Sequence, residues 1–410
     1  MKRQLLTQMR NEWRSNIWII MELAIVGVVT WSCFTLIVHL VSLRMQHYGY
    51  STDNLYHAEV MYIPKESVSY KEYTDSIHNH VTDLAMIRSK LSDNPYVETT
   101  GLGSNSMPYN FNFLGSGITF TEADSTYTYF GNRRFITPEV VRMLKLEGFN
   151  GETTEQLAAM IEKGDIIVSN TNIERDDQAH PEDYIGKDVI LDRDSTRTYR
   201  VGGTAYGIHR SDYEELFLGV IYFPLSSNDW GNEMIIEVKP DMGQKFIEST
   251  KASDLEHGNV YLSDLKSLDQ MRQEAHHSIH TVVRNQTVCA VFLLLIIFLG
   301  FLGTFWFRIQ QRTSEIAVRM VNGATRNDIF RRLLSEGFAL LAISSLISIS
   351  LEIAMIHYEV GNWGMKISSI IPWLAMICAT AVLAIMITAG IWMPAHKAMN
   401  INPASALKDQ

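Results

Sequence analysis

The sequence predicts an α-helical membrane protein with four transmembrane helices and a mixed α/β periplasmic domain inserted between spans 1 and 2. Three observations predict this fold class. The chain has 410 residues, 46% of them hydrophobic, and the apolar residues concentrate in four long runs. Charged residues fill one long stretch between the first two runs. The segments on one side of the predicted membrane carry net positive charge.

Each apolar run has the length of a membrane span. A helix needs about 20 apolar residues to cross a hydrocarbon core of about 30 Å. A helix that is apolar on every face belongs in lipid or against other spans. The first run is too long for the core of a signal peptide and has no small-residue cleavage site after it, so we expect it to remain as a span. The predicted spans are residues 17–43, 283–307, 338–357 and 370–393.

The charge on the connecting segments sets the orientation. Both termini and residues 308–337 together hold 12 basic and five acidic residues, whereas residues 44–282 hold 21 basic and 37 acidic ones. Lysine and arginine favour the cytoplasmic side, so we expect residues 44–282 to form an exported domain. Its acidity disfavours nucleic acid as a partner. The remaining segments are a cytoplasmic amphipathic helix (1–16), a cytoplasmic loop (308–337), a short periplasmic loop (358–369) and a cytoplasmic tail (394–410).

The periplasmic domain has to be stabilised by a hydrophobic core. The three cysteines, Cys33, Cys289 and Cys378, all lie in predicted spans. The domain therefore contains no disulfide, and a large apolar core is the remaining source of its stability.

Two helices are predicted in this domain. Apolar residues at helical spacing over residues 71–91 predict one helix, with Val81 and Leu84 on its buried face. The sequence TPE at residues 137–139 supplies a cap, a first-turn proline and a first-turn acid, and predicts a second helix that continues to Gly148.

Strand-like runs alternate with these helices and predict two small mixed lobes. Helical spacing from Leu265 onward predicts a stalk that continues into the second span. The predicted strands are residues 55–63, 96–100, 127–136, 165–169, 198–203 and 234–239.

Chemical motifs are few, and we expect no catalytic and no metal site. His276, His277 and His280 form an HHxxH pattern. His276 and His280 share one helix face and could bind a metal, but no third ligand is evident, so we expect polar histidines on a solvated helix. The sequence lacks a phosphate-binding G-x-x-x-x-G-K-[ST] loop, so we expect no ATP hydrolysis by this route. The stretch GLGSNSMPYNFNFLGSG at residues 101–117 predicts a surface loop, with a mobile contact loop as the alternative.

The cytoplasmic loop contains a broken helix, here called the knuckle (residues 315–325). Glu315 and Arg319 form an i,i+4 pair in the favoured order. Residues 322–323, Asn-Gly, stop this helix, and Thr325 with Asp328 forms a capping box for the next one. The apolar side of the knuckle is Ile316, Met320 and Ala324.

These residues carry a resemblance to a known family. Glu315, Ile316, Arg319, Gly323 and Ala324, followed by the capped helix, resemble the signature of the FtsX-like, MacB-type permease subunits of ABC transporters. The order of one span, a large domain and three further spans is similar to that family. The tail resembles the closing motif of the family at Pro394, Ala395, Ala398, Pro403, Ala406 and Leu407.

The resemblance implies that the chain works with a separate ATPase. In this family the loop between spans 2 and 3 contains a coupling helix that sits in a groove of the ATPase subunit. The chain is then not an enzyme and binds no cofactor, because its partner binds ATP and Mg²⁺. Further implied partners are a second copy or a paralogous permease, a periplasmic adaptor and an outer-membrane protein. The contacts to the ATPase are expected at Glu315, Ile316, Arg319, Met320, Gly323 and Ala324.

The implied function is efflux or extraction of a substrate, driven by ATP. Two alternatives stay open: lipoprotein release or control of a cell-wall hydrolase by a permease of the same family, and a membrane sensor or scaffold that needs no ATPase. Two acids lie within predicted spans, Glu22 and Glu352. A charge at mid-bilayer costs roughly 2.5–3.5 kcal/mol on insertion scales, so these acids snorkel, pair, or lie at a dimer seam.

The predicted topology is testable by cysteine labelling. In a variant without the three native cysteines, a cysteine at Asp177 is expected to react with an impermeant reagent added from outside. A cysteine placed within residues 312–337 is expected to react only from the cytoplasmic side. Labelling of position 177 from the cytoplasm alone contradicts this topology.

Overall fold

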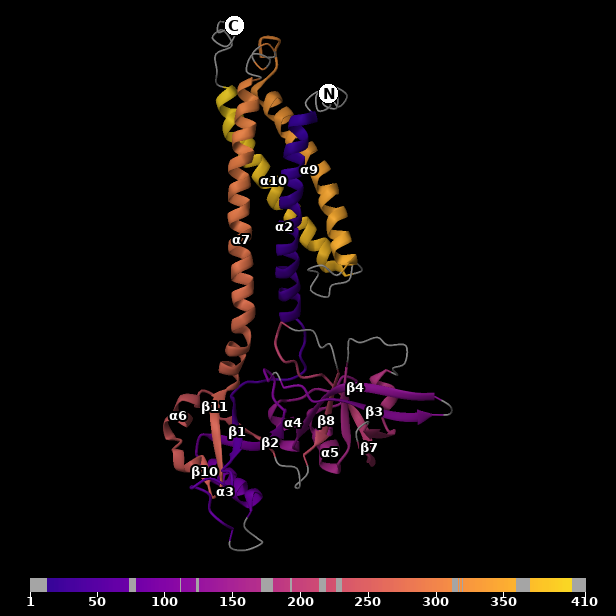
Figure 1. Ribbon diagram of the computed structural model, residues 1–410, viewed down its shortest axis with the longest axis vertical. Coiled ribbons are helices and arrows are strands. Elements are labelled where there is room, and N and C mark those ends of the chain that lie inside the picture. The colour runs from indigo at the N-terminus through magenta and orange to yellow at the C-terminus, as the bar shows by residue number, and fades with distance from the viewer. Residues whose placement is uncertain are drawn as a thin grey trace. The chain divides into compact units, whose positions relative to one another are not determined.

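The computed structural model of the chain consists of two compact units (Figure 1). The helical unit comprises Met1–Ser42 and Ile279–Gln410, and the inserted domain comprises Leu43–Ser278. The structure describes residues 13–73, 79–110, 112–122, 125–170, 180–191, 194–213, 219–225, 231–311, 316, 318, 320–358 and 369–399.

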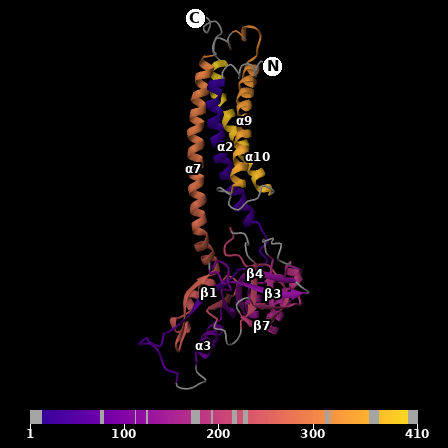
Figure 2. The same cartoon turned by 45° about the vertical axis from the view of Figure 1, so that its right-hand side comes forward.

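Within these described ranges, four helices are long and apolar enough to cross a membrane, which confirms the prediction of four apolar helices. Helices α9 and α10 lie side by side in both views of the molecule (Figures 1 and 2). Leu23, Leu340 and Ile387 belong to one buried cluster that α2, α9 and α10 share. The four helices are α2 (Trp13–Arg44), α7 (Leu268–Gln311), α9 (Arg326–His357) and α10 (Ile370–Met399).

Helix α7 differs from the other three. None of the described side chains in its apolar part, residues 283–300, is buried, so lipid or another chain has to cover them. Its first turns, up to Ser278, belong to the inserted domain. The prediction of one helix that continues without a break from the inserted domain into the second apolar run is therefore confirmed.

Five strands of the inserted domain form an open array, in which each strand is antiparallel to its neighbours. Helix α3 (His80–Ser92) packs on this array, and Leu84, Ile87 and Leu91 fill the cluster beneath it. The order of the array is β10 (Glu256–His257), β11 (Val260–Ser267), β1 (Leu55–Tyr62), β9 (Glu233–Val238) and β2 (Val97–Ser104).

Six further strands close into a ring, because β4 and β8 pair in parallel at its two ends. Ile118, Tyr129 and Val201 belong to the hydrophobic cluster of these strands. The two predicted lobes thus correspond to an open sheet and a closed barrel, which a short pairing between β2 and β4 connects. The barrel order is β4 (Ser125–Ile136), β3 (Gly115–Glu122), β6 (Asp188–Leu191), β7 (Asp194–Ala205), β5 (Ile166–Ser169) and β8 (Gly219–Pro224).

Short helices cover the sheet. Helices α4 (Pro138–Met143) and α5 (Thr154–Lys163) contact each other, and their apolar residues share a buried cluster with Leu268, the first residue of α7. Helix α6 (Gly243–Ser249) adds Phe246 to the core of the open array.

Both predicted helices are present, but two of their predicted ends are wrong. Residues 71–73 are not helical, and α3 begins at His80 because the side chain of Asn79 accepts hydrogen bonds from the N–H groups of Val81 and Thr82. Val81, predicted on the buried face, is 45% exposed. Helix α4 ends at Met143 and not at Gly148, because Lys145 adopts a left-handed conformation with φ of 48°.

The prediction of a surface loop at residues 101–117 is also wrong, because residues 105–109 are buried. The fully buried guanidinium of Arg134 donates to the carbonyl oxygens of Asn105 and Met107, each at 2.9 Å. The carboxylate of Glu233 accepts from the N–H (2.7 Å) and hydroxyl (2.6 Å) of Ser106. Burial opposes the ionisation of Glu233, but neighbouring His57 and these hydrogen bonds outweigh it and lower its pKa.

The turn before β11 makes a close approach that only glycine permits. Gly258 has φ of +60°, and a Cβ there would lie 2.1 Å from a carboxylate oxygen of Asp83. Asp83 is 4% exposed. Its carboxylate accepts from the Asn259 N–H at 2.9 Å and from the Tyr73 hydroxyl at 2.6 Å. Burial and the hydrogen bond to Asp83 raise the pKa of Tyr73 to about 12, so its hydroxyl remains a donor.

A pair of substitutions separates backbone strain from this contact. Gly164→Ala, at φ of +90° with open space around it, is expected to cost roughly 1–2 kcal/mol. Gly258→Ala is expected to cost roughly 1–3 kcal/mol more, because Asp83 has to leave its donors. The free energies of unfolding are compared in a soluble fragment of residues 43–278. Equal losses in both variants contradict a role for the Asp83 contact.

Candidate functional site

The described part of the knuckle ends its first helix in a left-handed turn. Gly323 has φ of +91°, and its N–H donates to the carbonyl oxygen of Met320 at 3.1 Å. The Asn322 side-chain amide donates to the carbonyl oxygen of Val318 at 2.9 Å. A left-handed glycine with these bonds satisfies the carbonyl groups that a helix end leaves open.

The second helix starts two residues later with a capping box. The Thr325 hydroxyl accepts from the Asp328 N–H at 3.2 Å, and the Asp328 carboxylate accepts from the Thr325 N–H at 3.0 Å. Both ends of the corner are thus held by local hydrogen bonds, which favours one fixed shape over an ensemble.

The knuckle has an inward and an outward side. Ile316 is 6% exposed and belongs to the buried cluster of the helical unit, together with Ile19 and Ala395. Val318 is 47% exposed and Val321 65% exposed. Exposed apolar side chains on a rigid corner are suited to insertion into a groove of another protein.

Sequence reasoning missed both of these valines. The i,i+4 spacing of Ile316 and Met320 was visible in the sequence, and it defines the side that packs against the buried cluster of α2, α9 and α10. Val318 and Val321 lie at i+2 and i+5 from Ile316, which places them on the other side of a helix. This spacing was the signal that could have found them.

The other residues predicted at this site are only partly within the described chain. Met320 packs against the buried cluster, Ala324 is half-buried and Gly323 is exposed. Glu315 and Arg319 lie outside the described residues, as do Pro403, Ala406 and Leu407 of the tail motif. Pro394 and Ala395 form part of α10, where Ala395 is fully buried.

The two acids of the apolar helices have different surroundings. Glu352 of α9 is 6% exposed, and its carboxylate accepts from the hydroxyl of Ser32 in α2 at 2.7 Å. Glu22 is half-buried, and a Cβ added to Gly300 of α7 would lie 2.9 Å from its carboxylate. Glu352 therefore links α2 to α9, and Gly300 allows α7 to approach Glu22. Their functional roles stay predictions.

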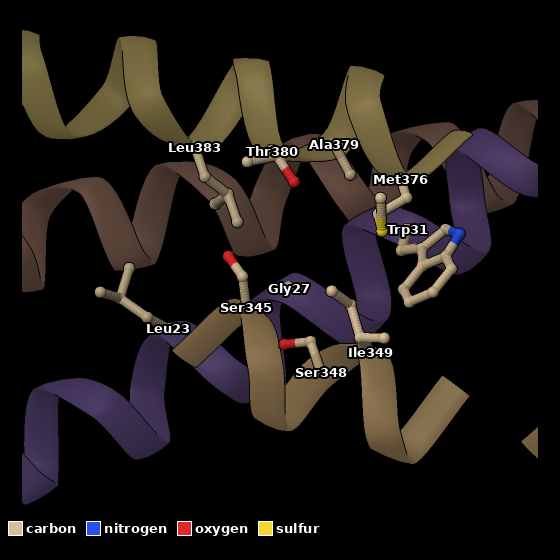
Figure 3. A pocket seen from close by; sticks show the side chains of 10 residues that line it. All are labelled: Leu23, Gly27, Trp31, Ser345, Ser348, Ile349, Met376, Ala379, Thr380 and Leu383. Atoms are coloured by element: carbon tan, nitrogen blue, oxygen red, sulfur yellow. The ribbon is translucent and has the colours of Figure 1, made fainter. Parts of the chain in front are cut away.

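Helices α2, α9 and α10 enclose a small cavity (Figure 3). Its volume is about 20 Å³, which is room for about one water molecule. Gly27 lies against Ser348, because a Cβ there would be 2.4 Å from its Oγ atom, and that hydroxyl donates to the carbonyl oxygen of Ala24 at 2.9 Å. The hydroxyl-bearing residues Ser345 and Thr380 also line the cavity. The cavity is too small for a transported substrate.

The predicted absence of a metal site concerns His276, His277 and His280. In the part of the chain that the structure describes, no three histidine, cysteine, aspartate or glutamate residues are grouped to hold a metal ion. His277 and His280 are exposed, but His276 is 6% exposed, so the prediction of a solvated helix is wrong for this residue. Its Nε2 atom accepts from the main-chain N–H of Asp212 at 3.3 Å.

Comparison with known proteins identifies the C-terminal region. Residues 287–403 match the family described as FtsX-like permease C-terminal. The chain carries an FtsX-like permease domain. This domain contains the knuckle together with α9 and α10, and the resemblance to the FtsX-like, MacB-type permeases of ABC transporters is confirmed.

Curated proteins match the sequence of this chain at a distance. The macrolide export ATP-binding/permease protein MacB of Shigella boydii serotype 4 is 22% identical over 257 residues. MacB of Escherichia coli strain K12 is 22% identical over 254 residues. Each match covers 60% of this chain and 38% of the relative, so the chain spans less than two thirds of the length of these relatives.

Two solved structures are also similar to this chain. The extracellular domain of the noncanonic ABC-type transporter YknZ from Gram-positive bacteria is 13% identical and has a TM-score of 0.31, covering 51% of this chain and 100% of that one. The periplasmic region of MacB from Actinobacillus actinomycetemcomitans is 13% identical and has a TM-score of 0.31, covering 57% and 97%.

Proposed function

We propose that this chain is the permease subunit of an ABC transporter in a bacterial inner membrane. It crosses the membrane four times and places the inserted domain in the periplasm. A separate cytoplasmic ATPase binds ATP and Mg²⁺, and its closure moves the knuckle and the spans attached to it. The chain itself carries no cofactor and catalyses no reaction. The output is efflux or extraction of a substrate.

The observation that carries this proposal is the knuckle within the FtsX-like domain. It combines a hydrogen-bonded corner with two exposed valines, while Ile316 fixes it to the cluster of α2, α9 and α10. A flexible loop would absorb a movement of the ATPase. A capped corner that packs on α2, α9 and α10 transmits this movement to the helices. The sequence also places Glu315 and Arg319 in this segment, where we expect them to contact the ATPase.

The proposed assembly contains two permease chains, either identical or paired with a paralogue. The unburied apolar part of α7 supports a second chain in the membrane. A periplasmic adaptor and an outer-membrane protein are further partners if the substrate leaves the cell. They are not needed if the same motion releases a lipoprotein or controls a cell-wall hydrolase.

A sensor or scaffold that works without an ATPase is the rival from another class. Such a protein would have the same membrane helices and inserted domain, but its function would not require an exposed apolar surface on the knuckle. Association with an ATP-binding cassette protein in the native membrane therefore distinguishes the permease from the sensor.

The test substitutes the exposed surface of the knuckle. Val321→Asp introduces a charge where an apolar contact is proposed, and loss of a central interface residue commonly costs at least about 1–2 kcal/mol, or roughly a 5- to 30-fold loss of affinity. We expect weaker pull-down of the ATPase and lower ATP turnover of the reconstituted complex. Gly323→Val is expected to have the same effect, because a β-branched residue resists the left-handed turn.

The matched control is Val68→Asp, which makes the same change at a fully exposed valine of the inserted domain. This variant should insert normally and bind the ATPase like the wild type. Wild-type levels of ATPase pull-down and ATP turnover in both knuckle variants contradict the coupling role. The segment is then a basic loop that only determines membrane topology.

A further inference from the structure

Asp212 of the inserted domain is a buried acid with an unusual set of partners. It is 3% exposed, and its carboxylate accepts from the Tyr109 hydroxyl at 3.0 Å and from the Arg272 Nε atom at 2.6 Å. A second guanidinium nitrogen of Arg272 completes the ion pair with the same carboxylate oxygen. The carboxylate is therefore satisfied by one cation and one hydroxyl.

The main chain of the same residue makes two further bonds. Its carbonyl oxygen accepts from the Tyr48 hydroxyl at 3.1 Å, and that hydroxyl shares its one proton with the carbonyl oxygen of Leu43, also at 3.1 Å. Its N–H donates to the Nε2 atom of His276 at 3.3 Å, and this nitrogen lies 3.8 Å from the Asp212 carboxylate.

These partners come from two particular segments of the chain. Tyr48 lies four residues after Arg44, the last residue of α2. Arg272 and His276 lie in the first turns of α7, which begins at Leu268. Asp212 thus binds both segments through which the inserted domain continues into apolar helices.

Aromatic rings pack around these polar groups. The rings of Tyr213 and His276 are 4.8 Å apart, and those of Tyr48 and His209 are 5.0 Å apart. Arg44 donates to the Tyr213 hydroxyl at 3.5 Å. Burial, with a smaller effect of nearby Arg134, lowers the pKa of His209 to about 4, so His209 stays neutral.

Stability alone does not explain this ion pair, whose carboxylate is buried while the Arg272 side chain is 37% exposed. Removing water from a carboxylate costs several kcal/mol, and well-packed apolar residues of the same volume are often as stabilising. The domain also has its own hydrophobic clusters under both lobes. An ion pair with fixed hydrogen bonds is better suited to holding one geometry than to adding stability.

We propose that Asp212 is a latch that holds the segment after α2 and the first turns of α7 together as one mechanical element. A displacement of either apolar helix then reaches the inserted domain through both segments at once. The role of the latch in coupling rests on the proposed function, whereas the latch itself is defined by contacts within the inserted domain. It assigns Asp212 as a positioning residue for coupling.

The test uses amide hydrogen exchange of the full-length chain in lipid nanodiscs. Asp212→Asn keeps the shape of the side chain and removes the charge that holds Arg272. We expect exchange of residues 43–50 and of residues 268–278 to rise together by roughly 5- to 30-fold, while strand β4 keeps its protection. Glu122→Gln is the control, since it removes an exposed ion pair with Lys187 in the barrel and is expected to change neither segment.

A second variant separates the latch from a local structural effect. Tyr48→Phe removes the bond between the first segment and the carbonyl oxygen of Asp212. If the segments are latched, exchange also rises in residues 268–278, to which the Tyr48 hydroxyl is not bonded. A rise confined to residues 43–50 in this variant, or unequal responses of the two segments to Asp212→Asn, overturns the latch.

A pull-down of the ATPase keeps the two proposals apart. Asp212→Asn is expected to bind the ATPase like the wild type, because the knuckle is untouched, and loss of binding contradicts the assignment of Asp212 to coupling alone. If the wild-type chain binds no ATPase, the proposed function fails, whereas the exchange experiment still decides whether the latch exists.

Discussion

The continuous backbone hydrogen bonding of α7 is the constraint on which the proposed coupling depends. The helix runs from Leu268 to Gln311, and its 44 residues correspond to about 66 Å at 1.5 Å per residue. A membrane core of about 30 Å needs less than half of that length. The helix is therefore longer than a membrane crossing requires, and its residues up to Ser278 belong to the inserted domain. At its other end α7 leads, along the chain, into the knuckle.

A domain inserted between two apolar helices has to be tied at both of its ends. The hydrophobic cluster that includes Leu268 ties the start of α7 to α4 and α5, and the Asp212 latch ties it to the segment that follows α2. The knuckle has a comparable arrangement, in which Ile316 is packed on the spans and Val318 and Val321 remain exposed. Both places combine a buried anchor with a defined corner of the chain, and both belong to the proposed path from ATPase to inserted domain.

Local chemistry was predictable from the sequence, whereas contacts between distant segments were not. The four apolar helices were predicted because a lipid environment requires long apolar runs, and the Thr325 cap was predicted because its partner Asp328 is three residues away. The burial of residues 105–109 was missed because it depends on Arg134 and on Glu233, which is 127 residues from Ser106. Asp212 was missed for the same reason, since Tyr48 is 164 residues away. The spacing of Val318 and Val321 from Ile316 places them on the opposite side of the knuckle, but only the packing of Ile316 with α2 and α10 shows which side is buried.

The most direct test of the account is hydrogen exchange of the wild-type chain in complex with its ATPase, compared between the nucleotide-free state and a state trapped with ATP. ATP is expected to change exchange in the knuckle and also in residues 43–50, 208–213 and 268–278 of the inserted domain. A change that stays within the knuckle, with identical exchange throughout the inserted domain in the two states, would contradict coupling between the ATPase and this domain.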